Sequence, residues 1–171
     1  MAARHRSRKR ALQVLFEWDQ RGEDISEAIR HYYESLHSAE SESETPLKAD
    51  RFMEELVRGT VAKVEAIDAV IQAKAEHWRI ERMAVVDRNI LRLAVFEMQQ
   101  GAVPGAVIID EALDLARQFS GDESIPFLNG VLDAIRRQAA ASTEETPVAA
   151  PAPETAAARR ESEDSLPDTE S

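Results

Sequence analysis

The sequence predicts an all-α fold, a bundle of about six to seven helices, and two observations support that prediction. Only 6 of the 171 residues are glycine, and the apolar residues are mostly Ala, Leu, Ile and Val mixed with Glu and Arg. This composition favours helices over strands. Apolar residues also recur every three or four positions over much of the chain, which is the spacing of a helix face. The length suits one domain with a sizeable core.

The first two helices are predicted near the N-terminus. Between about residues 7 and 21, one apolar stripe is formed by Ala11, Val14, Leu15 and Trp18, and Gly22 follows as a stop signal. A second helix is expected over about residues 25–36, because apolar residues fall on one side there. The next residues, 38–45, have the sequence SAESESET, which predicts an exposed loop.

The middle of the chain predicts a long helical region and a central helix. Between about residues 47 and 77, apolar positions keep helical spacing across Gly59, which fits one long helix or two helices joined at residues 58–60. Residues 83–100 are apolar around much of the helix circumference, which indicates a central, largely buried helix. Trp78, just after the long region, is interpreted as a lid on the core in preference to a stacking platform.

Two further helices and a tail complete the predicted order. After Gly101 and Pro104, helical spacing runs through residues 107–119, and Gly121 is a suitable stop. A last helix over about residues 125–138 contains Gly130. A glycine inside a helix reduces its stability by about 1 kcal/mol relative to Ala, so we expect Gly130 to be there because a neighbouring helix crosses too closely for a Cβ atom. Residues 139–171 are rich in Ala, Pro, Glu, Ser and Thr and are predicted to be disordered. The helical domain is therefore expected to span residues 1–138.

Charge is distributed unevenly along the chain. The net charge is −11, yet residues 1–10 contribute +5 and residues 139–171 contribute −6, which leaves about −10 for the middle. A basic tip on an acidic body predicts a localised anionic ligand. The eight acids of the tail either screen the N-terminal arginines or discourage unintended nucleic-acid contacts, or they belong to a solubilising extension with no specific role; the last interpretation is favoured.

Composition and motifs exclude several function classes. Without any Cys, the chain has no disulfide or thiolate nucleophile, which suits a reducing compartment, so a cytoplasmic protein is expected. It has no apolar run of about 18 residues, so a membrane span is not expected. Nucleotide-binding, P-loop and zinc-protease motifs are absent, and the four His are not clustered. The pairs Glu54/Glu55 and Asp110/Glu111 fit solvated helix faces and caps better than acid-base chemistry or a divalent-ion site. We expect no enzyme, cofactor or metal.

The basic tip has the residue types that bind single-stranded RNA. Arg6, Arg10 and Gln13 fall opposite the apolar stripe of the first helix, and Lys9 and Phe16 lie at its border. The planar guanidinium group of arginine can donate paired hydrogen bonds to phosphates and to the edges of unpaired bases, and Phe16 is the candidate for stacking a base. Phosphate contacts by all five basic residues would give a slope of log affinity against log salt of about −3.5. Tight binding is therefore expected to need a protein partner.

Three stretches of the chain resemble the NusB family of transcription antitermination factors. They are RKRALQVLFEW at residues 8–18, ILRLAVFEM at residues 90–98 and VIIDEALDLARQFSGDESIPFLNGVLD at residues 107–133. The third stretch is the most specific, because the family shows an I-N-E-A-x-x-L-A-x-x-F segment followed by F-V-N-G-V-L-D. The resemblance covers roughly residues 4–137 and implies two three-helix subdomains packed side by side.

The resemblance also implies a function and partners. Family members form a complex with the ribosomal protein NusE, and this complex binds the boxA element of nascent ribosomal RNA transcripts. It then joins other Nus factors on the elongating RNA polymerase and suppresses premature termination. Two alternatives stand beside this one. A domain attached to a ribosomal RNA methyltransferase is disfavoured because no nucleotide-binding fold is expected after the helical domain, and the second is a helical scaffold without specific RNA binding. Some family members form homodimers, so a homodimer is a further expectation.

Candidate site residues follow from matching positions with the family. The side chains of Arg6, Arg8 and Arg10 are expected to face outward, and Phe127 matches a family aromatic near the RNA. Two positions depart from the family: Phe16 stands where relatives often have Tyr, and Pro126 replaces a basic residue of some relatives. The expected RNA-binding set is Arg4, Arg6, Arg8, Lys9, Arg10, Gln13, Phe16 and Phe127. The expected NusE-binding residues are Asp87 and Arg88, the alternative for Asp87 being an ordinary surface charge.

Overall fold

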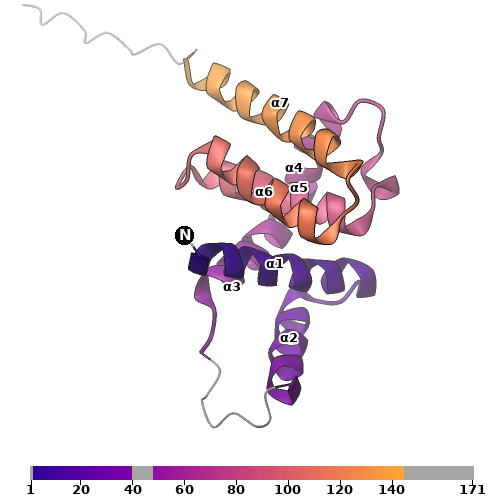
Figure 1. The fold of residues 1–171 in the computed structure, drawn as a ribbon, viewed down its shortest axis with the longest axis vertical. Coiled ribbons are helices and arrows are strands. Elements are labelled where there is room, and N and C mark those ends of the chain that lie inside the picture. Colours follow the sequence, from indigo (N-terminus) through magenta and orange to yellow (C-terminus); the bar gives the residue numbers. More distant parts are fainter. Residues whose placement is uncertain (1, 40–47, 145–171) are drawn as a thin grey trace, which may run out of the picture.

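Helices account for nearly all of the structure. The computed structural model describes residues 2–39 and 48–144, and within these ranges it contains seven α-helices, one 3₁₀ turn and no strand (Figure 1). The helices are α1 (Ala2–Arg21), α2 (Ile25–Ala39), α3 (Arg51–Ala62), α4 (Val64–Lys74), α5 (Val85–Gln100), α6 (Gly105–Phe119) and α7 (Ser124–Glu144), and the turn η1 spans Ile80–Arg82. The predicted all-α class is confirmed.

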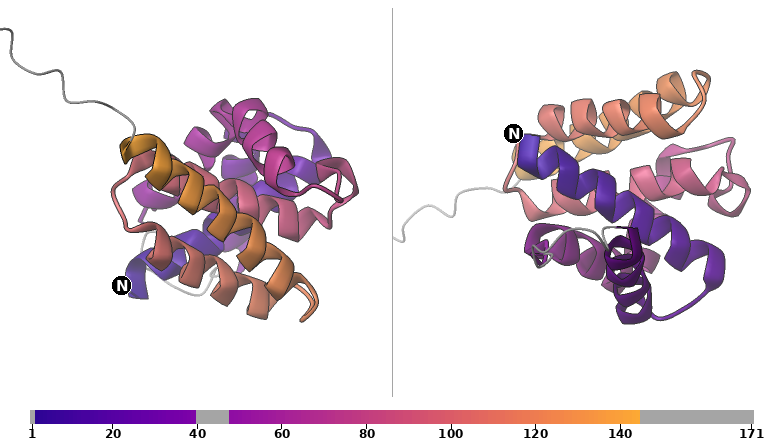
Figure 2. Two further views of the ribbon diagram at one scale, coloured as in Figure 1. Left: turned by 90° about the horizontal axis from the view of Figure 1, so that it is seen from above. Right: turned by 60° about the horizontal axis from the view of Figure 1, so that its bottom comes forward.

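The helices form two groups that meet at α5. In Figure 1, α1, α2 and α3 occupy the lower half, and α6 and α7 the upper half; Figure 2 shows the same separation when the molecule is tilted. Helix α5 packs against α1, α3, α4, α6 and α7, and α4 also contacts α7. The two expected three-helix groups are therefore α1–α3 and α5–α7, with α4 beside the second. As predicted for the central helix, residues 89–97 of α5 are all buried.

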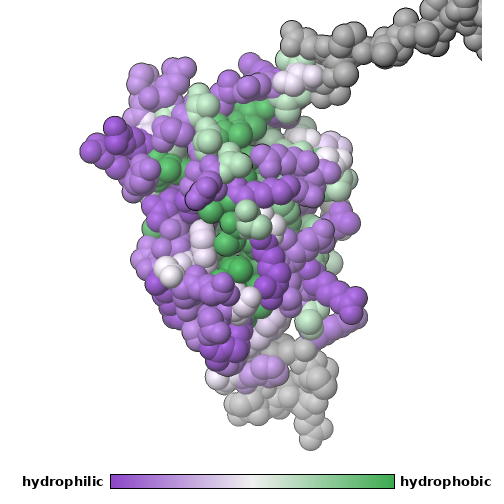
Figure 3. Space-filling view, turned by 180° about the vertical axis from the view of Figure 1, so that it is seen from behind, coloured by the Kyte–Doolittle hydropathy of each residue, from purple (hydrophilic) through white to green (hydrophobic). Residues whose placement is uncertain are grey.

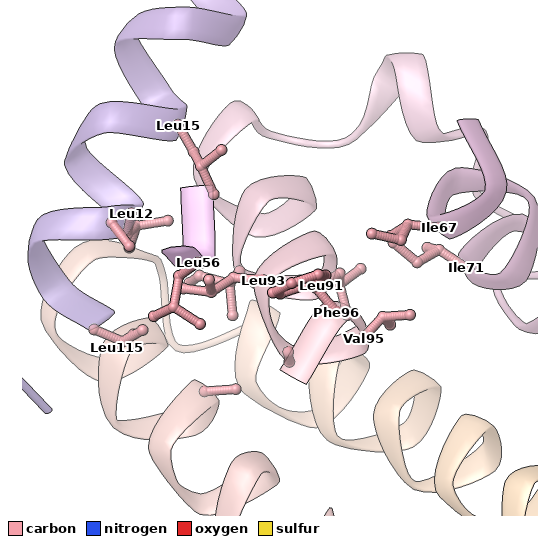
Figure 4. Packing of buried hydrophobic residues seen from close by; sticks show 14 of the residues in the cluster. Leu12, Leu15, Leu56, Ile67, Ile71, Leu91, Leu93, Val95, Phe96 and Leu115 are labelled. Carbon is pink, nitrogen blue, oxygen red and sulfur yellow. The ribbon is translucent and has the colours of Figure 1, made fainter. Parts of the chain in front are cut away.

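The hydrophobic core runs continuously through both groups. Figure 4 shows leucines of α1 and α3 on one side of α5 and two isoleucines of α4 on the other. Helix α5 supplies side chains to both sides, so one cluster of buried residues joins the halves. Burying a Leu or Ile side chain contributes about 1.5–3 kcal/mol, which makes this cluster the main source of stability. The labelled members are Leu12, Leu15, Leu56, Ile67, Ile71, Leu91, Leu93, Val95, Phe96 and Leu115.

The long helical region is two helices, but the predicted joint at residues 58–60 is wrong. Helix α3 ends at Ala62 and α4 begins at Val64, with Lys63 between them at φ −114 and ψ 15. The backbone N–H of Lys63 donates to the carbonyl oxygens of residues 60 and 61, which tightens the last turn of α3. No glycine is needed for such a break, because these angles suit any residue.

The close helix crossing predicted at Gly130 lies at Gly59 instead. A Cβ built on Gly59 would stand 2.1 Å from Cζ of Phe96, so α3 approaches α5 closely only because Gly59 has no side chain. Gly130 is exposed, and nothing lies within 4 Å of a Cβ built there. The prediction for Gly130 is therefore wrong, and the same reasoning holds at a different glycine.

Three helix ends extend beyond their predicted limits. Helix α1 begins at Ala2 rather than near residue 7, so the basic residues are themselves helical. Helix α2 continues to Ala39. Helix α7 continues to Glu144, six residues past the predicted boundary at 138, because Ala139, Ala140 and Ala141 are strong helix formers. The rest of the predicted loop, residues 40–45, and of the predicted tail, residues 145–171, lies outside the described residues.

The surface is mostly hydrophilic, with apolar residues concentrated locally. Figure 3 shows apolar residues along the middle of the face seen from behind, with hydrophilic residues at its flanks. Among the described residues, three large hydrophobic side chains are exposed: Phe16, Trp78 and Phe119. None of the helices in residues 2–39 and 48–144 is long and apolar enough to cross a membrane.

Candidate nucleic-acid interface

The basic tip, residues 2–10, forms the first turns of α1. Arg4 and Arg6 are exposed there, and within the part of the chain that the structure describes neither forms an ion pair. The guanidinium carbon of Arg4 lies 5.2 Å from the centre of the Phe52 ring, a cation–π contact that orients this side chain. Because the tip is already helical, these cations reach an incoming ligand without first ordering a loose segment.

Arg8 is buried, so the expectation that it faces outward is wrong. Its Nε and Nη2 donate to the two carboxylate oxygens of Glu97 at 2.8 Å each, and its Nη1 lies 3.4 Å from Oε2 of Glu111. The side chains of Arg8 and Glu97 are 4% and 6% exposed. The hydrogen bond to Glu97 raises the pKa of Arg8 above its ordinary value, and burial opposes this rise. Arg8 therefore holds α1 against α5 and α6.

Arg10 is only partly free, because it is tied to the start of α3. Its Nη1 donates to Oδ2 of Asp50 at 3.0 Å. Asp50 also accepts from the hydroxyl of Ser7 and caps α3 by accepting from the backbone N–H of Met53. Burial raises the pKa of the Asp50 carboxyl, but these hydrogen bonds outweigh it and leave the pKa below its ordinary value. Arg10 thus stabilises a helix cap while keeping about a third of its side chain exposed.

Gln13 and Phe16 lie along a groove rather than in the basic tip. The groove has a volume of about 400 Å³ and is mainly apolar. Phe16 and Phe119 are 39% and 37% exposed and both line it, while Lys9 places its ammonium 5.3 Å from the centre of the Phe119 ring. We call this the apolar groove, lined by Leu12, Gln13, Phe16, Glu17, Tyr32, Ser35, Leu36, Val86 and Phe119.

Phe127 is not brought together with the basic tip. It lies near the start of α7, which Figures 1 and 2 place away from the N-terminal end of α1. Its ring is half-buried and packs against Trp78, with 5.9 Å between ring centres. Trp78 itself is 56% exposed, so its interpretation as a core lid is wrong. The two rings form an aromatic pair apart from the basic tip, in which Trp78 is the exposed member.

The expected partner-binding residues both make intramolecular bonds. Asp87 is 8% exposed and accepts hydrogen bonds from the hydroxyls of Ser120 and Ser124, which hold the turn between α6 and α7 against α5. Asp87 is therefore not an ordinary surface charge. Arg88 donates through Nε and Nη2 to the carboxylate of Asp19 at 2.6 and 2.8 Å.

Asp19 is the centre of a charged cluster that fastens α1 to α5. Besides Arg88, it accepts from Nδ2 of Asn89 at 2.9 Å and from Nη1 of Arg92 at 3.0 Å. Arg92 also donates to both carboxylate oxygens of Asp68 on α4. Burial raises the pKa of the Asp19 carboxyl, yet the hydrogen bonds and positive charges around it outweigh burial and lower the pKa. The cluster joins α1, α4 and α5.

The described residues show no metal-binding cluster of three or more His, Asp or Glu side chains. His5 instead has its Nδ1 2.8 Å from Oε2 of Glu111, and Glu54 accepts from the hydroxyl of Tyr33. Glu111 is half-buried beside Arg8, so its interpretation as part of a solvated face is wrong. These carboxylates serve the contacts between helices, which favours a binding protein over acid-base catalysis.

Comparison with known proteins decides the family. The model of the NusB family matches residues 5–137 of the chain. The chain belongs to the NusB family. Transcription antitermination protein NusB of Solibacter usitatus is 54% identical over 138 residues, which cover 81% of this chain and 91% of that protein. NusB of Streptomyces coelicolor is 42% identical over 137 residues, covering 80% and 94% respectively.

Solved structures agree with this membership of the NusB family. The NusB chain in a crystal structure of antitermination factors NusB and NusE in complex with double-stranded RNA superposes with a TM-score of 0.68 at 29% identity, covering 81% of this chain and 98% of that one. The solution structure of NusB from Aquifex aeolicus gives a TM-score of 0.66 at 30% identity, covering 87% and 97%. The predicted NusB-like fold is therefore confirmed.

Sequence reasoning missed two features of this NusB-family chain, and one of them had a signal. Arg8 precedes Ala11 and Leu15 by three and seven positions, so it belongs to the buried stripe of α1. Its burial could have been predicted from that spacing. The apolar groove had no comparable signal, because it is assembled from α1, α2, α5 and α6, and Phe119 reaches it from more than 100 residues away.

Proposed function

We propose that this chain is a transcription antitermination factor that binds RNA together with a protein partner and catalyses no reaction. The RNA is the boxA element of nascent ribosomal RNA transcripts, and the partner is a NusE-type ribosomal protein. The assembled pair marks the transcript and joins other Nus factors on the elongating RNA polymerase. One observation carries the RNA-binding part: Arg4 and Arg6 are exposed without a carboxylate partner among the described residues, on a body that is otherwise acidic.

The available positive charge is smaller than the sequence suggests. Arg8 and Arg10 hold Glu97 and Asp50, which leaves Arg4, Arg6 and Lys9 for phosphates. Three contacts with single-stranded RNA give a slope of log affinity against log salt of about −2, compared with about −3.5 for five contacts. So few contacts provide modest affinity, which supports recognition by a pair of proteins rather than by this chain alone.

The apolar groove is the surface that we propose for the NusE-type partner. Two of the three exposed large hydrophobic side chains of the described residues, Phe16 and Phe119, lie in it, and exposed aromatic clusters are typical of protein interfaces. Val86, at the start of α5, lines the same groove. Its neighbours Asp87 and Arg88 contribute by fixing the start of α5, through Ser120, Ser124 and Asp19 as described above.

Titration of labelled boxA RNA, with and without NusE, tests the proposal. We expect weak binding by this chain alone and tighter binding when NusE is present; equal affinity in both titrations would reject joint recognition. The double variant Arg4→Ala/Arg6→Ala should weaken RNA binding while helicity and NusE affinity stay unchanged. A matched control is Arg30→Ala/Arg58→Ala, which removes the same charge from exposed positions of α2 and α3 and should leave RNA affinity unchanged.

The partner surface is tested separately. Phe16→Ala and Phe119→Ala should each weaken NusE binding by about tenfold, which corresponds to about 1.4 kcal/mol. Trp78→Ala, which removes an exposed aromatic elsewhere, is the control and should have no effect on NusE binding. Loss of self-association in the Phe variants, with NusE affinity unchanged, would show that a second copy of this chain covers the groove.

A further inference from the structure

Beyond α7 the chain carries a concentrated acidic segment, residues 161–171, which contains no basic residue and five acids: Glu161, Glu163, Asp164, Asp168 and Glu170. The NusB-family match ends at residue 137, and the match to the Solibacter usitatus relative spans 91% of that protein but 81% of this chain. The acidic segment therefore lies outside the part of the chain that the family shares. Any role it has is additional to the family's common activity.

Most arginines of the described body already hold a carboxylate and attract a further acid only weakly. Arg79 and Arg82 have no ion pair among the described residues, but they share a cleft with Glu76 and Glu81, whose charges repel an acidic ligand. The basic tip differs, because Arg8 and Arg10 already hold the carboxylates that reach it, while Arg4 and Arg6 are exposed and have no ion pair among the described residues. The body arginines in ion pairs include Arg21, Arg30, Arg88, Arg92, Arg117, Arg136 and Arg137.

The end of α7 lies within reach of the basic tip. Both ribbon views place the C-terminal end of α7 and the N-terminal end of α1 on the same side of the molecule (Figures 1 and 2). Residues 145–160 span up to about 55 Å when extended, whereas a domain of this size has a radius of gyration of about 15 Å. The connection after Glu144 is therefore long enough for the acidic segment to reach Arg4 and Arg6.

We propose that the acidic segment binds the basic tip of its own molecule and competes there with RNA. This inference rests on the proposed RNA-binding role of the tip. This competition makes RNA binding more selective. RNA that contacts the tip alone must displace the acidic segment with the tip's affinity only, whereas RNA that also contacts a partner protein has additional affinity with which to displace the segment. The segment thus suppresses binding to unrelated RNA.

The expected effect is moderate and depends on salt. Individual exposed ion pairs are weak, but a tethered ligand acts at an effective concentration in the millimolar range, so we expect the segment to reduce RNA affinity about fivefold at low salt. The reduction should disappear at about 1 M salt, where the Debye length is about 3 Å. A contact built on apolar burial would not show this dependence.

The first test measures RNA affinity of the full chain with the segment neutralised. The variant carries Glu161→Gln, Glu163→Gln, Asp164→Asn, Asp168→Asn and Glu170→Gln, and it should bind boxA RNA about fivefold more tightly at low salt. The matched control neutralises five exposed acids of the body: Glu55→Gln, Glu65→Gln, Glu76→Gln, Glu81→Gln and Asp110→Asn. A gain equal to that of the control would reflect net charge only and would overturn the inference.

The second test detects the contact without RNA. Because the chain has no cysteine, Ser171→Cys provides a unique site for a spin label on the full chain. The label should broaden the amide signals of residues 2–10, and both the neutralised segment and Arg4→Ala/Arg6→Ala should abolish this broadening. Broadening that is absent, or that centres on residues 79–82, would overturn the inference. If no variant binds RNA, the proposed function fails, and this measurement still decides whether the contact exists.

Discussion

Arg8→Ala is the substitution that best separates the structural from the RNA-binding role of the basic tip. The guanidinium of Arg8 donates to both carboxylate oxygens of Glu97, and these two side chains are 4% and 6% exposed. Alanine would leave the Glu97 carboxylate buried without its counter-charge. Removing one partner of a buried ion pair costs about 3–5 kcal/mol, out of a total stability of about 5–15 kcal/mol for a typical domain.

Urea denaturation followed by circular dichroism measures this loss directly. Arg8→Ala should lower the free energy of unfolding by about 3–5 kcal/mol, whereas Arg6→Ala, at an exposed position, should change it by less than about 0.5 kcal/mol. The double variant Arg8→Met/Glu97→Met removes both charges and fills the space with apolar atoms. It should recover most of the lost stability, because no buried charge remains unpaired.

Two results would refute this reasoning about Arg8. One is a loss of less than about 1 kcal/mol in Arg8→Ala, which would place the pair among weak exposed ion pairs. The other is an Arg8→Ala variant that keeps its stability and loses as much RNA affinity as Arg6→Ala does. In that case Arg8 would contact RNA rather than hold α1 in place.

Two further predictions concern packing and pH. Gly59→Ala should destabilise by about 1–3 kcal/mol, because its Cβ would lie 2.1 Å from Cζ of Phe96. By contrast, Gly130→Ala should stabilise the protein by up to about 1 kcal/mol, because nothing lies within 4 Å of a Cβ built on Gly130. Equal shifts of Tm in the two glycine variants would contradict these two predictions. The fold lowers the pKa of Asp19 and of Asp50. Each carboxylate therefore contributes its full stabilisation above the unfolded pKa of about 4, and this stabilisation is lost as the pH falls through the lower pKa of the folded state. The free energy of unfolding in urea should therefore decline from about pH 4 downwards, and Asp19→Asn should reduce that decline; an unchanged pH profile in the variant would argue against the charged cluster.

Helix positions were predictable from the sequence because apolar spacing is a local property. The stripe that begins at Ala11 and the apolar residues spread around α5 both appear as buried surfaces in the structure. The break at Lys63 was not predictable in the same way, since its backbone angles suit any residue. The choice between Gly59 and Gly130 as the crossing point also depends on which helix packs opposite each glycine.

The candidate site was less predictable than the fold, because charge in a sequence does not reveal which charges are already paired. On sequence alone Arg8 and Arg10 count as free cations, because their partners Glu97, on α5, and Asp50, just before α3, lie 89 and 40 residues away along the chain. Trp78 was expected to cover the core, yet the loop after α4 leaves it mostly exposed. Local patterns identified the residue types of the tip, and tertiary contacts decided which of them stay available.

The central place of α5 has a consequence for how the chain folds during synthesis. Helices α1 and α3 pack against each other and against α5, which begins only at residue 85, so the first 62 residues emerge from the ribosome before the helix that covers both of them exists. Domains fold as units during synthesis, and closing contacts of such sequence separation slows folding. The N-terminal half, including the arginines that meet RNA, therefore acquires its final packing only after α5 has been made.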